Sequence, residues 1–236
     1  MTPAEGAVPV LHEDAHVLAV DKPAGRLVIP GRGTDERSLR EELEAVHGRL
    51  WVVHRLDRGT SGVLLFARTA EAHRTLNLAF DRGEPRKCYL ALVRGVPPEE
   101  RRIDLAIAPA RRGRMRPARA GDARGKAAAT VVRALERFPP RAWAGGALAL
   151  VEALPETGRT HQIRVHLAAV GLPLAIDPDY GDAAPLVGPD GAPLLARTPL
   201  HAVRLEVAHP AGGGPLVVEA PWPADLTRTV EALRRG

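Results

Sequence analysis

Residues 50–67, with the sequence LWVVHRLDRGTSGVLLFA, place a short polar loop between two apolar segments. The apolar segments, 50–53 and 63–67, have the length and composition of buried strands. The loop between them carries Asp57, which is flanked by arginines and followed by glycines. Such a loop can present a carboxylate to a bound ligand. A local ion pair between Asp57 and one of its arginines would explain the same pattern, so the loop alone does not assign a function.

Outward from this loop, apolar periodicity predicts a mixture of helices and strands. Ser38 and Glu41 form a capping-box pattern at the start of the first helix. Helices are expected over 39–47, 69–80 and 161–170. Strands are expected over 8–11, 16–20, 50–53, 63–67, 87–93, 103–107, 130–135, 147–154, 201–207 and 216–219. These elements predict an α+β fold with a large, mainly antiparallel mixed sheet flanked by helices.

The composition is that of a globular protein. The chain has 236 residues, of which 45% are apolar and 26% are charged, so it can bury a sizeable core. Cys88 is the only cysteine, which excludes an internal disulfide and a cysteine-based zinc knuckle. No apolar stretch approaches the roughly 18 residues of a membrane span, and no secretory signal begins the chain. We expect a cytoplasmic protein without membrane contact, built as a single domain over residues 1–236.

Positive charge is concentrated in one segment. The net charge is +5, and residues 101–126 hold nine arginines and lysines against two aspartates. Glycines and prolines interrupt this segment, as expected for an exposed arm. A solvated basic loop is one reading. The other is a loop that contacts the phosphates of a nucleic acid, for which the candidates are Arg111, Arg112, Arg114 and Arg116.

A second motif, residues 156–167, follows an expected strand and opens the third helix. Thr160 is the expected N-cap of this helix and Gly171 its C-terminal stop. The helix should pack through the apolar face made by Ile163, Leu167 and Val170. Arg164 lies on another face, where it could meet a carboxylate from a neighbouring loop.

Taken together and in this order, five segments resemble the RluA family of pseudouridine synthases over nearly the whole chain. They are 17–25 (VLAVDKPAG), 54–62 (HRLDRGTSG), 87–95 (KCYLALVRG), 158–167 (GRTHQIRVHL) and 176–181 (IDPDYG). Asp179 departs from the family pattern, in which an apolar residue is more usual. We expect Asp179 to lie away from the chemistry and to affect local packing or substrate fit.

The resemblance implies a bacterial enzyme that isomerises uridines in structured RNA, either ribosomal or transfer RNA. The bond between uracil nitrogen one and the ribose breaks, and the ribose is rejoined to carbon five. Because no atom is gained or lost, no metal, nucleotide or other cofactor is expected. Asp57 is implied as the catalytic carboxylate, whether it attacks the ribose, attacks the base or acts by elimination. Arg164 would hold Asp57 ionised, and Tyr89 would stack on the uracil.

The resemblance also implies residues that contact RNA. Arg55 would fill the position vacated when the target base leaves its stack. Further RNA contacts are expected from Arg58, Arg159 and His161, in addition to the four arginines of the basic segment. Target selection would fall to this one domain, because no separate N-terminal RNA-binding module is expected. We expect a monomer.

Two other classes of function are compatible with parts of the sequence. A metal-dependent hydrolase is suggested by the nine histidines. However, His161 and His166 are five residues apart, about 140° around a helix, whereas a four-residue spacing suits chelation of one ion. An RNA-binding or ribosome-assembly protein that has lost catalysis would keep the same fold and basic surface. The intact set of Asp57, Tyr89 and Arg164 argues against that alternative.

Overall fold

The structure, a computed structural model, describes residues 8–31 and 35–235. The chain forms two compact units, each assembled from two chain segments. Unit 1 takes the residues up to Lys87 together with Ala202–Pro221. Unit 2 takes Cys88–His201 together with the residues from Trp222 onward. The expectation of one domain over residues 1–236 stays a prediction.

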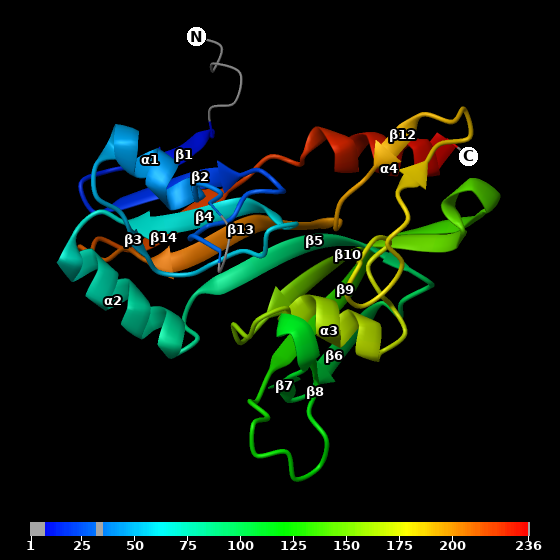
Figure 1. Ribbon diagram of the computed structural model, residues 1–236, viewed down its shortest axis with the longest axis horizontal. Helices are drawn as coiled ribbons and strands as arrows, with labels where there is room; N and C mark the ends of the chain where they lie inside the picture. The colour runs from blue at the N-terminus through cyan, green and yellow to red at the C-terminus, as the bar shows by residue number, and fades with distance from the viewer. Residues whose placement is uncertain (1–7, 32–34, 236) are drawn as a thin grey trace. The chain divides into compact units, whose positions relative to one another are not determined.

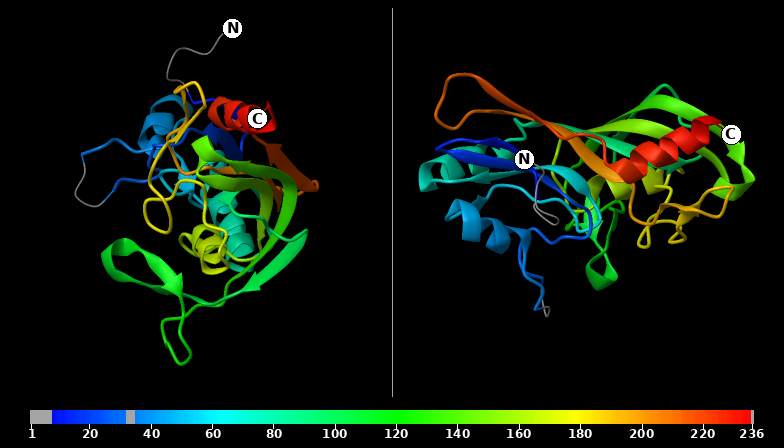
Figure 2. Two further views of the ribbon diagram at one scale, coloured as in Figure 1. Left: turned by 90° about the vertical axis from the view of Figure 1, so that its right-hand side faces the viewer. Right: turned by 90° about the horizontal axis from the view of Figure 1, so that it is seen from above.

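Unit 1 is built around a sheet with the strand order β1-β2-β4-β13, in which β3 also pairs with β4 and β14 with β13. The pairs β1–β2, β2–β4, β3–β4 and β13–β14 are antiparallel. Its strands are β1 (Val10–Glu13), β2 (Val17–Lys22), β3 (Trp51–Val52), β4 (Ser61–Ala67), β13 (Leu200–Ala208) and β14 (Pro215–Glu219). Its helices are α1 (Leu39–His47) and α2 (Ala70–Asp81). Figure 2 shows β13 and β14 as an extended hairpin.

The core of unit 1 follows from strand alternation. Every second residue of β2 and β4 faces the same side, where α2 packs across them (Figure 1). From α2 this core receives residues at helical spacing, namely Ala72, Leu76 and Ala79. β4 is buried along its whole length, so the Asp57 loop that precedes it is attached to the most enclosed strand of the unit.

Unit 2 contains strands in the order β5-β10-β9-β6, all antiparallel. These are β5 (Arg86–Arg94), β6 (Glu100–Asp104), β9 (Ala129–Arg141) and β10 (Gly146–Pro155). Two small hairpins accompany them, β7 (Ile107–Pro109) with β8 (Met115–Pro117), and β11 (Leu186–Val187) with β12 (Pro193–Leu195). The helices are α3 (Gln162–Ala169) and α4 (Ala224–Arg235), with short 3₁₀ turns at Arg111–Gly113 and Ala142–Ala144.

The helix α3 packs on one face of the strands of unit 2. Ile163 and Leu167 are buried against β5, β9 and β10, with Val170 beside them, as the apolar pattern predicted. Residues 107–117, which comprise β7, the 3₁₀ turn and β8, are called the arginine arm below. The arm and the loop after it project from the strands of unit 2, as Figures 1 and 2 show.

Several expectations from the sequence need correction. The expected strand 103–107 is divided between β6 and β7, and β8, β11 and β12 were not expected. The helix α4 was missed, although Leu226, Val230 and Leu233 recur at helical spacing and are buried. Among the described helices, none is both long and apolar enough to cross a membrane.

Candidate active site

The loop that carries Asp57 is closed by a turn within unit 1. The amide of Thr60 donates to the carbonyl oxygen of Asp57 at 3.1 Å. The backbones of Gly25 and Arg58 are also joined, because the amide of Gly25 donates to the carbonyl of Arg58 at 2.7 Å. The segment 22–25 therefore lies against the Asp57 loop. This contact joins two of the five segments that carry the family resemblance, 17–25 and 54–62.

The side chain of Lys22 fixes the backbone of this loop. Its side chain is completely buried. The ammonium donates to the carbonyl oxygens of Pro23 at 3.0 Å, Arg58 at 3.2 Å and Thr60 at 2.7 Å. A buried ammonium needs such acceptors, since an unsolvated charge without them is costly. Lys22 thus holds the backbone of the loop in one conformation. The sequence did not predict this role.

The start of the loop is held by His54. Its Nε2 accepts a hydrogen bond from the Leu65 amide at 3.0 Å, and its ring stacks on Phe80 at 4.9 Å between centroids. Burial, with a smaller contribution from the charge of Lys87, lowers the pKa of His54 to about 3. The imidazole is therefore neutral at neutral pH. Its acceptor nitrogen ties the loop to β4.

At the far end of the loop, Gly62 allows a close approach of two strands. Its φ is +109°, and a Cβ at this position would lie 2.2 Å from the carbonyl oxygen of Ala202 on β13. Only glycine fits there without a shift of backbone.

The arginines beside Asp57 have different surroundings. Arg58 donates from Nε to the carbonyl of Gly25 at 2.9 Å and pairs with Glu36 at 3.0 Å. Its guanidinium remains more than half exposed. Arg55 is exposed. Both side chains can therefore reach a ligand outside the loop, and Arg58 has a carboxylate partner other than its neighbour in sequence.

Tyr89, in unit 2, lies on β5 opposite Ala153 of β10. It is partly buried and packs at the edge of the apolar cluster beneath α3. This environment suits an aromatic ring that packs partly on an apolar core.

The first turn of α3 is unusual. Its N-cap is His161 and not Thr160 as expected, and His161 adopts a left-handed backbone with φ of 54° and no side-chain capping bond. The turn is held instead by Gln162, which donates to the Ala129 carbonyl at 2.8 Å and accepts from Thr157 at 2.7 Å. Nearby, exposed Arg159 donates to the carbonyl of Ala127 at 3.1 Å. A non-glycine residue in this conformation stores strain, which tends to occur at functional sites.

Arg164 is buried and bound bidentately by Asp177. Its Nε donates to one carboxylate oxygen at 2.9 Å and its Nη2 to the other at 2.6 Å. Asp177 is 1% exposed and also accepts the backbone amides of Asp179 and Tyr180. The fork of the guanidinium matches a carboxylate in this way, and its plane is therefore fixed. Asp177 had no predicted role, although it lies in the segment 176–181.

Asp179 also contacts Arg164, which corrects the expectation that it lies away from the candidate chemistry. Nη2 of Arg164 donates to Asp179 at 2.8 Å, and Arg114 of the arginine arm donates to the other carboxylate oxygen at 3.1 Å. Burial alone would raise the pKa of Asp179, but the hydrogen bond and charge of Arg164, with Arg114 and His161, lower it on balance. Asp179 is therefore ionised near neutral pH.

Tyr180 joins the same group of residues. Its hydroxyl accepts the amide of Met115 at 2.8 Å and lies 2.8 Å from Nδ1 of His161. The guanidinium of Arg164 lies over its ring, 5.0 Å from the centroid. Burial, the largest influence, raises the pKa of Tyr180, which keeps the phenol protonated. His161, a candidate from the sequence, is thus oriented by Tyr180, which had no predicted role.

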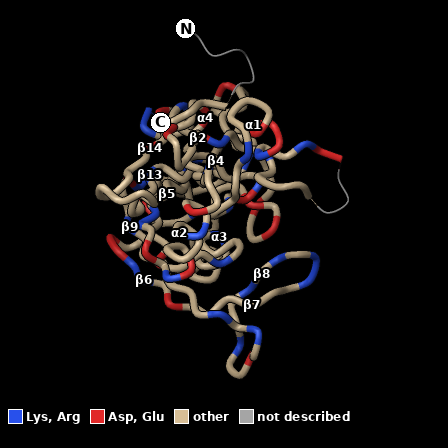
Figure 3. The backbone as a smooth tube through the Cα atoms, turned by 90° about the vertical axis from the view of Figure 1, so that its left-hand side faces the viewer, with Lys and Arg blue, Asp and Glu red and all other residues tan. Residues whose placement is uncertain are grey.

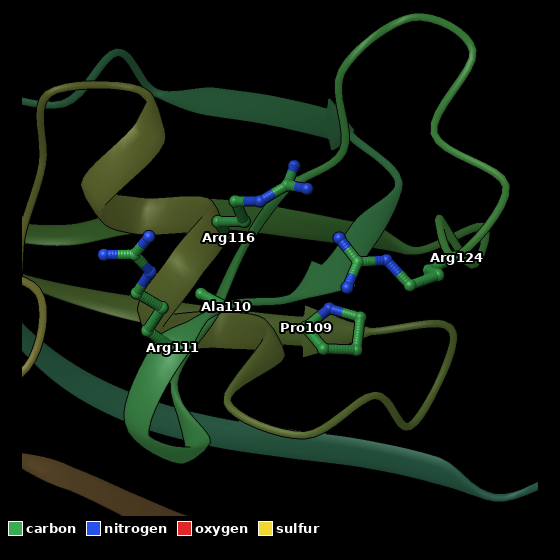
Figure 4. Close-up of a pocket in the computed structure, with 5 residues that line it drawn as sticks. All are labelled: Pro109, Ala110, Arg111, Arg116 and Arg124. Atoms are coloured by element: carbon green, nitrogen blue, oxygen red, sulfur yellow. The ribbon is translucent and has the colours of Figure 1, made fainter.

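The arginine arm and the loop after it carry mainly positive charge, shown in blue in Figure 3. A pocket of about 420 Å³ opens on this segment and is lined by Pro109, Ala110, Arg111, Arg116 and Arg124 (Figure 4). Asp122 pairs with Arg116 and lies 3.6 Å from Arg124. Two of the candidate phosphate ligands, Arg111 and Arg116, therefore line one pocket, and Arg124 joins them without having been predicted.

The histidines of α3 are engaged in hydrogen bonds. His166 is completely buried, with Nδ1 at 2.9 Å from the Thr130 hydroxyl and Nε2 at 2.9 Å from the carbonyl of Leu105. With both nitrogens bonded, His166 ties α3 to the strands. His161 bonds instead to Tyr180. Because the two histidines have different partners, their arrangement does not favour a metal ion bound by both.

In unit 1, three potential metal ligands do lie within 4.8 Å of one another, namely His12, Asp14 and His209. Both imidazole Nε2 atoms are within 2.9 Å of one oxygen of Asp14, and Nδ1 of His209 accepts the Ala211 amide at 3.3 Å. An Nδ1 that accepts leaves the proton on Nε2, so His209 donates to Asp14. Hydrogen bonding thus accounts for the cluster, which joins the β1–β2 turn to the β13–β14 hairpin.

Comparison with known proteins identifies the family. The sequence profile of RNA pseudouridylate synthases matches residues 16–169. The chain is 39% identical to ribosomal large subunit pseudouridine synthase D of Nitrosomonas europaea over 95% of its length and 65% of the relative's. It is 41% identical to the protein of the same name from Xanthomonas campestris, over 95% and 69%. The chain thus spans about two thirds of the length of these relatives.

A solved structure agrees with these relatives. The match to human RNA pseudouridylate synthase domain containing 1 covers 100% of this chain and 98% of the human chain, with a TM-score of 0.74 and 26% sequence identity. The α+β fold and the resemblance to the RluA family are therefore confirmed. The chain belongs to the family of RNA pseudouridylate synthases.

Proposed function

We propose that this protein isomerises uridine to pseudouridine in structured RNA, with Asp57 as the catalytic carboxylate. The observation that carries the proposal is the Asp57 loop, which lies inside the segment matched by the family profile. The loop is held by the buried ammonium of Lys22. Preorganisation of this kind is what a reacting carboxylate needs, because displacement of a catalytic group by about 1 Å can cost about 100-fold in rate.

The other residues have supporting roles in this proposal. Arg164 supplies an oriented positive charge, since Asp177 fixes the plane of its guanidinium. Tyr89 offers a partly buried ring on which the uracil can stack, and Arg55 fills the gap left by the extruded base. Arg58, Arg159 and His161 contribute further RNA contacts. The reaction conserves all atoms, so the protein needs no metal or nucleotide cofactor.

Ribosomal RNA is the first substrate to test. The two relatives from Nitrosomonas europaea and Xanthomonas campestris are named as ribosomal large subunit pseudouridine synthases. We therefore favour large-subunit ribosomal RNA over transfer RNA. The protein would act as a monomer in the bacterial cytoplasm, where that RNA is assembled into ribosomes.

The test is direct measurement of the product. Purified protein is incubated with large-subunit ribosomal RNA and, separately, with transfer RNA, both lacking pseudouridine. Nucleosides are then quantified by mass spectrometry. We expect pseudouridine in the ribosomal RNA. The Asp57→Asn variant is the matched control, because it preserves the size of the side chain but cannot act as a carboxylate. It should bind RNA and form no product, and turnover by this variant would refute the role of Asp57.

Product in transfer RNA alone would overturn the choice of substrate and leave the reaction standing. Binding of RNA without product in either would show instead an RNA-binding protein on the same fold.

A further inference from the structure

Asp179 lies where the arginine arm meets Arg164, all within unit 2. One of its carboxylate oxygens accepts from Nη2 of Arg164 at 2.8 Å and the other from Nε of Arg114 at 3.1 Å. Its side chain is 32% exposed, compared with 8% for Arg164 and 1% for Asp177. Asp179 therefore stands between a buried guanidinium and one that faces solvent.

The hydrogen bonds of Arg164 show what Asp179 adds. Asp177 receives Nε and one hydrogen of Nη2, and Asp179 receives the second hydrogen of Nη2. Both carboxylates therefore fix the rotation of the same guanidinium. Asp177 already balances the charge of Arg164. Asp179 adds one negative charge to this group, and Arg114 balances it.

The arginine arm is docked at the same place by neighbouring contacts. The amide of Met115 donates to the hydroxyl of Tyr180 at 2.8 Å. Ile107 packs in a small apolar cluster with Val165 of α3. Met115 and Tyr180 pack against this cluster. Residues 179 and 180 thus contact the arm on one side and α3 on the other, so displacement of the arm alters the surroundings of Arg164.

We propose that Asp179 is a positioning residue that fixes Arg164 and, by pairing with Arg114, withholds one arginine of the arm from RNA phosphates. This proposal rests on the function proposed above. The two effects have opposite consequences. The hydrogen bond to Arg164 favours the chemical step, and the ion pair with Arg114 weakens RNA binding. A residue that only stabilised the fold would not separate them.

Two variants test the two effects. Asp179→Asn keeps an oxygen that can accept from Arg164 but removes the charge that holds Arg114. It should bind RNA more tightly, with the log-affinity versus log-salt slope steeper by about 0.7 to 0.9, and its single-turnover rate should fall less than that of Asp179→Leu. Asp179→Leu removes both interactions. It should show the same steeper slope, with a rate about tenfold lower, as expected for one lost hydrogen bond to a charged group.

Arg114→Gln is the matched control for binding. Combined with Asp179→Asn, it should return the salt slope to the wild-type value, because the released arginine is absent. Hydrogen exchange of the amides in residues 107–117 reports on docking of the arm without requiring activity. Exchange should be faster in both Asp179 variants than in the wild type.

Each part of the proposal can fail separately. A wild-type rate for Asp179→Leu would overturn the positioning of Arg164. An unchanged salt slope for Asp179→Asn, or unchanged hydrogen exchange in both variants, would overturn the pairing that withholds Arg114. If the wild-type protein forms no pseudouridine on the same RNA, it is the proposed function that fails, and the exchange measurement still judges the link between Asp179 and the arm.

Discussion

Individual polar side chains with little exposure hold the candidate residues in place in both units. Lys22 has no exposed surface, and its ammonium is bonded to three backbone carbonyls. Arg164 is nearly as buried and is held by carboxylates. His54 avoids charge altogether through a lowered pKa. A buried polar group has to be paired or neutral, and these three groups use their pairing to fix backbone or side chains near the candidate site.

Replacement of Arg164 by lysine should reduce activity strongly although the charge is retained. An ammonium cannot reproduce the fork that donates to both oxygens of Asp177, so its charge would not be held in the same place. We expect Arg164→Lys to lower the single-turnover rate by about 100-fold, with little change in RNA affinity. Measurement of both quantities on one RNA checks this. A rate equal to wild type would make Arg164 a structural residue only.

His54 should make the folded protein sensitive to acid. Its pKa is about 3 when folded, compared with an ordinary 6.5, so between these values the unfolded chain binds a proton that the folded chain does not. Stability should therefore fall as pH decreases from 6.5 towards 3. The limit is about 1.4 kcal/mol per pH unit. His54 is only partly buried, which reduces the effect, and we expect about 1 kcal/mol per unit from this group.

The matched control is His54→Gln, whose side-chain oxygen can still accept from Leu65 but does not titrate. Urea unfolding of both proteins at several pH values gives the comparison. The pH dependence of the wild type should exceed that of the variant within this window. Equal slopes would show that His54 is protonated in the folded state.

Helices and hairpins place the candidate residues at their ends. Arg164 lies in the first turn of α3, three residues after the strained N-cap His161, and the Asp57 loop precedes the buried strand β4. The arginine arm is a short hairpin, anchored at Met115 and Ile107. Function therefore concentrates where regular elements stop, because side chains at such places project from a rigid support.

The tip of the arginine arm should supply affinity and not chemistry. Arg111 and Arg112 are exposed in the 3₁₀ turn. If they contact phosphates, replacing both by glutamine should reduce the magnitude of the log-affinity versus log-salt slope by about 1.4 to 1.8. The single-turnover rate at saturating RNA should change little. Salt-dependent binding titrations, paired with single-turnover kinetics, check both statements.

Arg74 and Arg228 provide the control for this prediction. They are exposed on α2 and α4, and their joint replacement by glutamine removes the same charge from other elements. Equal slopes for the two double variants would show that the arm attracts RNA only through net charge.

At the scale of the whole molecule, sequence order and spatial grouping differ. Each unit is built from two chain segments, and the chain passes between the units three times. Asp57 belongs to unit 1, whereas Tyr89 and Arg164 belong to unit 2. The proposed reaction therefore uses residues that belong to both units, and a single domain over residues 1–236 stays a prediction.

Activity should survive removal of metal ions. The proposed isomerisation needs no Lewis acid or redox partner. Prolonged dialysis against a chelator, followed by assay in its presence, should leave the rate of pseudouridine formation within about twofold of the untreated protein, a change of less than about 0.5 kcal/mol in activation free energy. A loss that added zinc restored would contradict the expectation of a cofactor-free enzyme. The His209→Gln variant would then show whether the cluster around Asp14 holds the ion.

The sequence by itself determined most of the helices and the strands of the large sheet, and it named the main candidate residues. The capping box of Ser38 and Glu41 starts α1 as predicted, and the apolar face of α3 packs as its spacing required. The helix α4 was equally readable from Leu226, Val230 and Leu233 but was missed. These features depend on residues within a few positions of one another, so local periodicity and capping are sufficient to predict them.

Only the tertiary structure decided how the candidates are held. Lys22 bonds to Thr60, 38 positions away, and Arg164 bonds to Asp177 and Asp179, 13 and 15 positions away. The tertiary structure also reversed the expectation for Asp179 and moved the N-cap of α3 from Thr160 to His161. Such contacts form when separate segments pack together. They leave no periodic signal in the sequence, because the position of each partner is set by the packing of the units and not by its neighbours along the chain.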